Sequence, residues 1–322
     1  MSSEKKRLLV LLGPTAVGKS GAAVRIAKAV GAEIINCDSM QVYKGFDIGT
    51  DTISENEREG IPHHLLNFIE PDTQFTAADF VRHAVDAISI IRAAGRLPLI
   101  TGGTGLYVQA LIDGLFPEGA KNPSIRRDLE EERASLGLET LWMRLVEVDP
   151  AYAQKIDPHD GVRIIRALEV HRITGIPFSR HLPMTRSAVQ DYDVLKIGLR
   201  MNRDLLYARI ERRVDRMYAE GIIRETRTLL DSGVPAGAPP FRALGYKHVV
   251  ALLEGKRNEE EAVLLTKRDS RRYAKRQMTW FRKMKGVLWF DAQDVHAVIT
   301  TVCEHFGLKD KQGPSFHRDG TV

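Results

Sequence analysis

Cysteine is scarce in this sequence: its 322 residues include only Cys37 and Cys303. Two cysteines cannot build a disulfide framework or a multi-cysteine zinc cluster, and such a low count is typical of a reducing compartment. No apolar run approaches the roughly 20 residues that a membrane span needs. We therefore expect a cytoplasmic protein with no membrane partner, whose 43% hydrophobic residues supply a core without cross-links.

Acidic residues are scarce in one segment near the carboxyl end of the chain. Between residues 267 and 285, nine of nineteen residues are Lys or Arg, and Asp269 is the only acid. The segment is either a solvated helix face or a strip that contacts the phosphates of a polyanion. The net charge of +5 does not decide between these interpretations, because many enzymes are mildly basic.

Strand and helix patterns alternate in the first third of the chain. The sequence predicts strands at 7–12, 33–38 and 97–101 and helices at 19–30 and 76–94, with Thr76 and Asp79 forming a capping box at the second helix. This alternation predicts an α/β fold, with a parallel sheet flanked by helices. Ligands of such sheets bind at the carboxyl ends of the strands.

The character of the chain changes near Leu115. The following segment is rich in charges and helix formers, and strand character returns only at 193–199 and 287–290. We predict an α/β core formed by 1–116 and 190–308, an inserted helical domain at 117–189, and a disordered tail at 309–322.

A phosphate-binding loop follows the first predicted strand. The segment GPTAVGKS matches G-x-x-x-x-G-K-[ST] and leads into a helix, which is the context that a P-loop requires. Its backbone N–H groups and lysine would hold a diphosphate, and its serine would ligate Mg²⁺. The predicted diphosphate-binding residues are Gly13, Pro14, Thr15, Ala16, Val17, Gly18, Lys19, Ser20 and His63.

Three further features near this loop remain open from the residues alone. Asp38, at the end of the second strand, is a general base, a group near Mg²⁺, or a structural carboxylate. The second glycine turn, TGGTGLY at 101–107, is another anion nest or only a tight turn. His63 and His64 are a structural pair or donors to the diphosphate.

Eight segments together resemble the tRNA dimethylallyltransferase family, the bacterial-type isopentenyl-tRNA transferases. They occur in the family's order from about residue 8 to 290. The segments are GPTAVGKS, DSMQVY from Asp38, DIGT from Asp47, PHHL from Pro62, GGTGLY, HDGVRIIRALEV from His159, LGYK from Leu244 and YAKRQMTWFRK from Tyr273.

The resemblance implies a P-loop NTPase-like fold and a prenyl transfer. A dimethylallyl group would pass from dimethylallyl diphosphate to the exocyclic 6-amino nitrogen of the adenosine on the 3′ side of the anticodon. Asp38 would be the general base, Lys19 and Arg213 would steady the departing diphosphate, and Ser20 would hold Mg²⁺. The helical insertion would grip the anticodon stem of the tRNA.

The resemblance also implies a set of tRNA contacts spread along the chain. They are Asp38, Ser39, Met40, Gln41, Thr104, Arg126, Arg163, Arg166, Arg242, Gly245, Tyr246, Lys247, Arg276, Gln277, Trp280, Arg282 and Lys283.

Two positions depart from the family pattern. Thr52 follows Asp51 where the family often carries Lys, so a cationic contact to the diphosphate or the RNA is missing or replaced. Gly161 and Val162 stand where Pro-Gln is frequent, and Val162 cannot make a glutamine-like contact.

Two other functions share part of this pattern. A P-loop small-molecule or nucleotide kinase would use the same loop and a similar sheet, but it would not need the basic segment at 267–285. An RNA-binding module with a vestigial P-loop would not need Lys19, Ser20 and Asp38 together. We expect a monomeric enzyme and favour prenyl transfer.

Overall fold

The computed structural model describes residues 6–114, 122–181 and 185–311. The chain divides into two compact units, Met1–Gln109 with Asp191–Val322, and Ala110–Gln190. The predicted insertion, 117–189, lies within the second unit. The predicted tail falls outside the described residues from position 312 onward.

The larger unit is built on one parallel sheet. Its strand order is β3-β2-β4-β1-β5-β6, and every neighbouring pair is parallel. The predicted α/β fold is therefore confirmed, while the short edge strand β3 was not predicted. The strands are β1 Lys6–Leu12, β2 Ala32–Asn36, β3 His63–His64, β4 Leu97–Gly102, β5 Tyr192–Arg200 and β6 Val287–Asp291.

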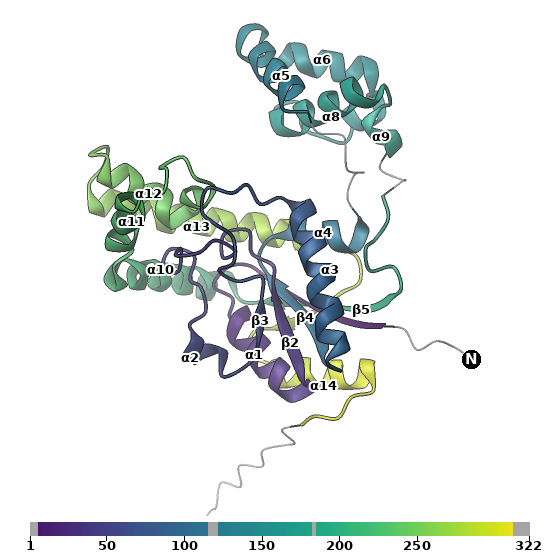
Figure 1. Cartoon of the computed structure of the whole chain (residues 1–322), viewed down its shortest axis with the longest axis vertical. Coiled ribbons are helices and arrows are strands. Elements are labelled where there is room, and N and C mark those ends of the chain that lie inside the picture. Colours follow the sequence, from purple (N-terminus) through teal and green to yellow (C-terminus); the bar gives the residue numbers. More distant parts are fainter. Residues whose placement is uncertain (1–5, 115–121, 182–184, 312–322) are drawn as a thin grey trace, which may run out of the picture. The chain divides into compact units, whose positions relative to one another are not determined.

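Helices cover both faces of this sheet (Figure 1). On one face α1 and α14 pack against β1, β4 and β5, while α3 packs against β2 and β4 on the other. The helices of the larger unit are α1 Lys19–Val30, α2 Glu55–Arg58, α3 Ala77–Ala93, α10 Arg203–Glu220, α11 Ile222–Asp231, α12 Leu244–Leu253, α13 Glu259–Phe281 and α14 Val295–Phe306, with a 3₁₀ turn at Pro239–Arg242. Helix α4, Gly105–Asp113, begins in the larger unit and ends in the smaller one.

The burial of β1 shows why its run of leucines forms a central strand. Leu9 and Leu11 belong to the core cluster shared with α1 and α14. Successive side chains of a strand point to opposite faces, so Leu8 and Val10 are buried on the side of α3. A strand covered on both faces needs apolar residues at every position.

The register of the sheet brings the two glycine turns to one edge. Leu12, the last residue of β1, is paired with Gly102 at the end of β4. Because these strands are parallel, the P-loop after β1 and the turn after β4 leave the sheet side by side.

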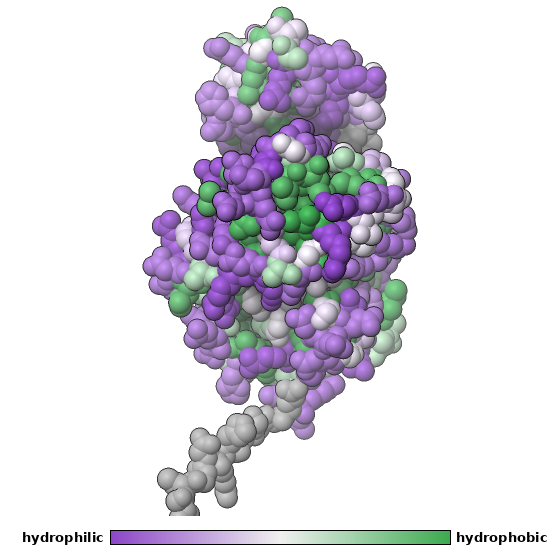
Figure 2. Space-filling view, turned by 90° about the vertical axis from the view of Figure 1, so that its left-hand side faces the viewer, coloured by the Kyte–Doolittle hydropathy of each residue, from purple (hydrophilic) through white to green (hydrophobic). Residues whose placement is uncertain are grey.

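A second apolar cluster joins helices α11 and α12 to the segment after β2. The ring of Phe46 makes edge contacts with Phe241 and Tyr246, each with centroids 5.0 Å apart. Figure 2 shows the side of the molecule on which α11 and α12 lie in Figure 1. In this view nonpolar residues gather in the middle of the face of the larger unit. This cluster anchors the loop that follows β2.

The smaller unit is helical. Its core residues include Leu129, Leu141, Leu145 and Ile164. Its two ends lie side by side, because Ala188 N donates to Leu111 O at 3.2 Å. Its helices are α5 Pro123–Leu136, α6 Leu138–Val148, α7 Pro150–Ala153, α8 Gly161–Thr174 and α9 Phe178–His181.

Replacing Gly102 should destabilise the sheet. A Cβ at this position would lie 2.0 Å from the carbonyl oxygen of Cys37, so Gly102→Ala should lower the free energy of unfolding by about 1–3 kcal/mol. Gly21, in α1, has open space where a methyl group would lie, and Gly21→Ala should instead raise the free energy of unfolding by about 0.5–1 kcal/mol. Urea unfolding of both variants measures the difference. Equal stabilities would contradict the close contact.

Candidate active site

The P-loop has the backbone geometry that phosphate binding requires. Gly18, just before α1, has φ 102°, a left-handed conformation that favours glycine. Val17 N donates to Pro14 O at 3.3 Å, which closes the loop. The loop therefore runs directly into the N-terminus of α1, where unpaired N–H groups attract anions.

Lys19 points its ammonium group into the loop. Its Nζ donates to Pro14 O at 2.9 Å. Burial lowers its pKa to about 8, although the nearby carboxylate of Asp38 acts in the opposite direction. A cation that has lost part of its hydration gains a favourable partner when an anion binds beside it.

A cavity of about 1,010 Å³ opens over the P-loop. The P-loop, the second glycine turn, the segment 47–54 and helix α10 form its walls. Four arginines of α10 line it together with Lys19, while six carboxylates line other parts of its wall, so cations gather beside the P-loop without giving the whole cavity a positive charge. Those arginines are Arg209, Arg212, Arg213 and Arg216.

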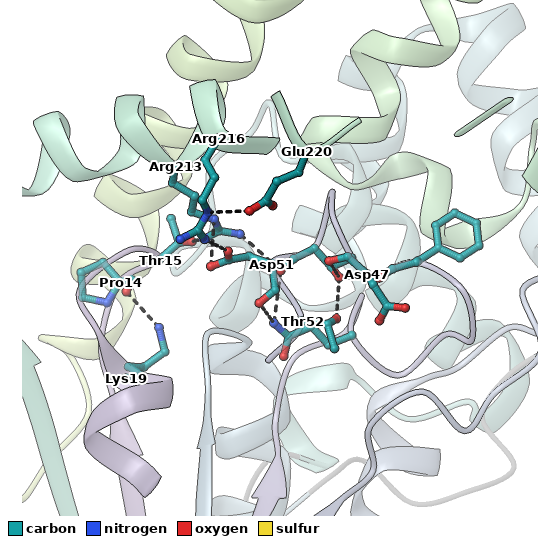
Figure 3. A network of polar contacts seen from close by, with 12 residues as sticks. Pro14, Thr15, Lys19, Asp47, Asp51, Thr52, Arg213, Arg216 and Glu220 are labelled. Carbon is teal, nitrogen blue, oxygen red and sulfur yellow. Dashed lines mark hydrogen bonds and ion pairs between the residues drawn. The ribbon is translucent and has the colours of Figure 1, made fainter. Parts of the chain in front are cut away.

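Arg213 connects three parts of this cavity (Figure 3). Its Nη1 donates to Thr15 Oγ1 in the P-loop, and its Nη2 donates to Thr50 O at 3.3 Å. Its Nε lies 3.2 Å from Asp51 Oδ2. The guanidinium is therefore held over the phosphate loop from α10.

Glu225 holds the segment that carries Thr50. Its carboxylate accepts from Asp47 N at 3.1 Å and Ile48 N at 2.9 Å. It also accepts from the hydroxyl of Tyr246, which in turn accepts from Gly49 N at 3.1 Å. Burial and the adjacent Glu225 raise the pKa of Tyr246, so this hydroxyl stays protonated and keeps donating. The turn at 47–52 is thus fixed from the second apolar cluster.

Asp38 lies where two cavities meet. Its Oδ1 accepts from Met40 N at 2.9 Å. Together with Thr15, Thr50 and Arg213, it lines both the large cavity and a second one of about 280 Å³. The second cavity has apolar walls from α10 and basic residues from the later helices, including Arg276. A carboxylate at this junction can reach groups bound on either side.

Gln277 joins the two glycine turns. Its Oε1 accepts from Thr15 N, and its Nε2 donates to Gly103 O, both at 2.8 Å. A Cβ at Gly103 would lie 2.4 Å from Gln277 Nε2, so only glycine allows this approach. The second turn therefore packs against the P-loop through α13, and Thr101, Gly102 and Gly103 face the large cavity.

The residues of the segment after Asp38 also lie at this junction. Ser39 N donates to Thr104 Oγ1 at 3.0 Å. Gln41 Nε2 donates to Thr50 O at 3.1 Å. The second cavity is lined by Ser39 and Met40 and, from the later segment, by Arg242, Gly245 and Arg276.

His63 and His64 have separate surroundings. His63 lines the large cavity, its Nδ1 lies 2.8 Å from Ile61 O, and burial lowers its pKa, which favours the neutral ring. His64 Nε2 lies 2.8 Å from the carboxylate of Glu33. Of the two histidines, only His63 lines the cavity that is predicted to hold the diphosphate.

The predicted tRNA residues on and after α13 differ in exposure. Arg276, Arg282 and Lys283 are exposed, while Trp280 is half-buried and packs against Gly105. Gln277 and Tyr246 are buried and bonded to the backbone, so both hold the site's framework in this structure. Lys247 is exposed at the start of α12.

Three predicted arginines belong to the smaller unit. Arg166 donates to the buried carboxylate of Glu169 at 2.9 Å, and Arg126 lies 3.6 Å from the same carboxylate. Arg163 lies 3.4 Å from Asp160. Glu169 thus gathers two of these arginines within the unit.

Several residues of the site were not predicted. Arg209, Arg212 and Arg216 share α10 with Arg213 at helical spacing, and this pattern of cations could have indicated one basic face. Asp51 and Glu225 had no comparable signal, because their partners lie far away in the sequence.

The sheet, the glycine loop and the arginines of α10 define an α/β protein of the P-loop type, whose cavity at the carboxyl ends of the strands suits a phosphorylated ligand. Residues 41–284 match the model of the family described as IPP transferase. The chain belongs to this family.

Relatives and solved structures agree with this assignment. A tRNA dimethylallyltransferase of Geobacter metallireducens is 47% identical over 288 residues, which is 89% of this chain and 93% of the relative. A full-length tRNA isopentenylpyrophosphate transferase of Bacillus halodurans, whose structure is solved, is 40% identical in sequence and matches with a TM-score of 0.71. The match covers 94% of this chain and 97% of that chain. A eukaryotic dimethylallyltransferase acting on tRNA is 28% identical, with TM-score 0.81 and coverage of 96% and 81%.

The affinity for inorganic diphosphate should fall as the pH rises above about 8. Lys19, whose pKa burial lowers to about 8, is charged below this pH and loses its charge above it, so the bound anion loses a partner. Calorimetric titrations over a pH series measure this slope. Lys19→Met is the control, since subtracting its series removes the effect of the ionisation of diphosphate itself. Parallel slopes for both proteins would contradict the role of Lys19.

Proposed function

We propose that this chain transfers a dimethylallyl group from dimethylallyl diphosphate to tRNA. The acceptor is the exocyclic 6-amino nitrogen of the adenosine on the 3′ side of the anticodon, and the product is isopentenyladenosine. One observation carries the proposal: Asp38 and Arg213 line both the large cavity over the P-loop and the smaller cavity beside it. A diphosphate on one side and an adenine on the other would meet at these two residues.

The charges of the large cavity suit a departing diphosphate. The bond from the dimethylallyl carbon to the diphosphate oxygen breaks, and the leaving group keeps the electron pair. Lys19, Arg213 and the N–H groups of the P-loop stabilise the negative charge that develops there. The apolar side chains Ile210, Val214 and Met217 line the smaller cavity and offer a surface for the prenyl chain.

Asp38 is suited to accept the proton of the amine. The adenine amino group is a poor nucleophile, and its nitrogen forms the new bond to carbon as it loses a proton. Met40 N binds only one oxygen of the Asp38 carboxylate. Among the described residues, no donor is hydrogen-bonded to the other oxygen, which is available to the substrate.

The residues of the P-loop fit a magnesium ion that arrives with the diphosphate. The described residues contain no group of three or more His, Cys, Asp or Glu side chains that could hold a metal by themselves. Mg²⁺ often keeps several waters and binds through substrate phosphates with few protein ligands. Ser20, at the start of α1 on the cavity wall, would supply its hydroxyl. When bound, the ion neutralises charge on the leaving diphosphate.

The tRNA would contact the exposed cations of the later helices. Arg276, Arg282 and Lys283 are exposed, and Arg276 also lines the smaller cavity. Backbone phosphates bind such clusters, while the modified base leaves its stack to enter the cavity. In the smaller unit Arg126, Arg163 and Arg166 are the proposed contacts to the anticodon stem.

Two further properties complete the proposal. We infer that the enzyme acts as a monomer, since both cavities are built by residues of one chain. A tRNA substrate also favours a location in the cytoplasm. No helix of the described residues is long and apolar enough to cross a membrane.

Asp38→Asn should abolish most of the transfer. The amide keeps an oxygen that can accept from Met40 N, but it cannot take up the proton, so the rate should fall by about 10²–10⁴-fold. Incorporation of radiolabelled dimethylallyl diphosphate into unmodified tRNA measures this rate. Affinity for inorganic diphosphate should not weaken, because the cavity only loses a negative charge. A well-folded wild type that labels no tRNA but hydrolyses or transfers the phosphate of ATP would favour the kinase alternative instead.

Neutralising Arg282 and Lys283 should weaken tRNA binding without affecting the diphosphate. The double variant Arg282→Gln with Lys283→Gln should bind tRNA less tightly, with a salt dependence shallower by about one unit for each phosphate that is no longer neutralised. Filter binding at several salt concentrations measures both quantities. Lys256→Gln is the control, because Lys256 is exposed in the turn before α13 and pairs with Glu254. An unchanged salt slope would contradict this tRNA interface.

A further inference from the structure

Asp51 lines the large cavity beside the arginines of α10, and the proposed chemistry does not use its carboxylate. Its Oδ2 lies 3.2 Å from Arg213 Nε, and its Oδ1 accepts from Arg216 Nη2 (Figure 3). Two arginines of the anion site are therefore paired with a negative charge that the protein itself supplies.

The pairing with Arg213 is an ion pair without a well-directed hydrogen bond. The Nε group of Arg213 is buried, and among the described residues it has no hydrogen-bond partner. The other two nitrogens of the guanidinium donate to Thr15 and Thr50. Arg213 can thus gain a better-aligned acceptor at Nε when a phosphate oxygen takes the place of the Asp51 carboxylate.

The backbone around Asp51 keeps this carboxylate in the cavity. Asp51 has φ 56°, in the left-handed region that Asp and Asn tolerate better than most residues. Its N–H donates to Ile48 O at 3.1 Å, and its O accepts from Gln41 Nε2 at 3.1 Å. Glu225 fixes the same turn through Asp47 and Ile48. The backbone of the turn is therefore fixed at several points, and the Asp51 side chain can rotate without moving it.

We propose that Asp51 competes with the diphosphate for Arg213 and Arg216. When no diphosphate is bound, the carboxylate occupies both arginines. When diphosphate binds, the side chain of Asp51 rotates away and the arginines take the phosphate oxygens. This inference rests on the proposed function, since it assumes that the cavity holds the diphosphate of the donor and product.

Such competition weakens the binding of both donor and product diphosphate. The incoming anion must displace an existing partner, and the displaced carboxylate remains close to it as a like charge. Weaker binding of both states raises the KM for the donor and lets the product diphosphate leave more readily. Asp51 would therefore set the affinity of the site and the ease of product release.

Asp51→Asn is the direct test, because it keeps the shape and the left-handed preference and removes the charge. Calorimetric titration with inorganic diphosphate at fixed Mg²⁺ should show roughly tenfold tighter binding, the result of removing a like charge from a partly buried anion site. In the transfer assay the KM for dimethylallyl diphosphate should fall and inhibition by product diphosphate should strengthen. If Asp51 served only as a structural support for Arg213, diphosphate would bind more weakly, the KM for the donor would rise and product inhibition would weaken.

Two matched variants separate competition from a general effect of charge. Asp38→Asn removes a carboxylate from the same cavity without releasing an arginine, and its gain in diphosphate affinity should be clearly smaller than that of Asp51→Asn. Glu220→Gln removes a carboxylate that also lines the cavity but lies 3.7 Å from Arg216 Nε and leaves Arg213 paired with Asp51, so its gain in diphosphate affinity should be clearly smaller than that of Asp51→Asn.

The outcomes distinguish this inference from the proposed function. If the wild type binds diphosphate and Asp51→Asn binds it equally or more weakly, competition is wrong, and weaker binding would indicate instead that Asp51 positions Arg213. If Asp38→Asn gains as much as Asp51→Asn, the specific pairing with the arginines is wrong. If the wild type does not bind diphosphate at all, both the inference and the proposed function are overturned. Thermal unfolding of each variant confirms that the comparison is made on folded protein.

Discussion

The two hydrogen bonds of the Gln277 side chain hold the site together. One binds the P-loop after β1 and the other binds the glycine turn after β4, so a single amide sets the spacing of two loops that the sheet brings to the same edge. The same residue belongs to α13, whose Arg276, one position before it, lines the smaller cavity. A buried amide with both groups bonded is costly to replace, because either loop would be left with an unpaired backbone group.

The rest of the site follows from a balance of charges around this framework. Helix α10 presents four arginines, and the P-loop adds a lysine that burial has made easier to neutralise. Such a concentration of cations requires either an anionic ligand or compensation from the protein. Asp51 supplies part of that compensation, on a turn that Glu225 and Tyr246 hold from the opposite side. The same arginines therefore form the ion pairs that stabilise the empty cavity and bind the ligand.

The sequence predicted the parts of the fold that depend on local pattern. The strand and the helix on either side of the glycine loop, the central strands and the capping box of Thr76 and Asp79 were confirmed, because apolar periodicity and capping act over a few residues. The edge strand β3 was missed, since two residues carry no periodic signal. The family resemblance was confirmed by the comparisons, and it indicated residues at the cavity junction such as Asp38 and Arg213. It could not show that Gln277 binds two backbone groups or that Asp51 pairs with Arg216, because these contacts depend on tertiary packing. Gln277 and Thr15 are 262 positions apart in the sequence, and Asp51 and Arg216 are 165 positions apart.

The side-by-side ends of the helical unit have an evolutionary consequence. Leu111 and Ala188 are hydrogen-bonded neighbours, although more than seventy residues separate them along the chain. Segments whose ends nearly touch can be lengthened, shortened or exchanged with little disturbance to the host domain. The length and sequence of the helical unit can thus change during evolution without altering the geometry of the active site in the α/β unit.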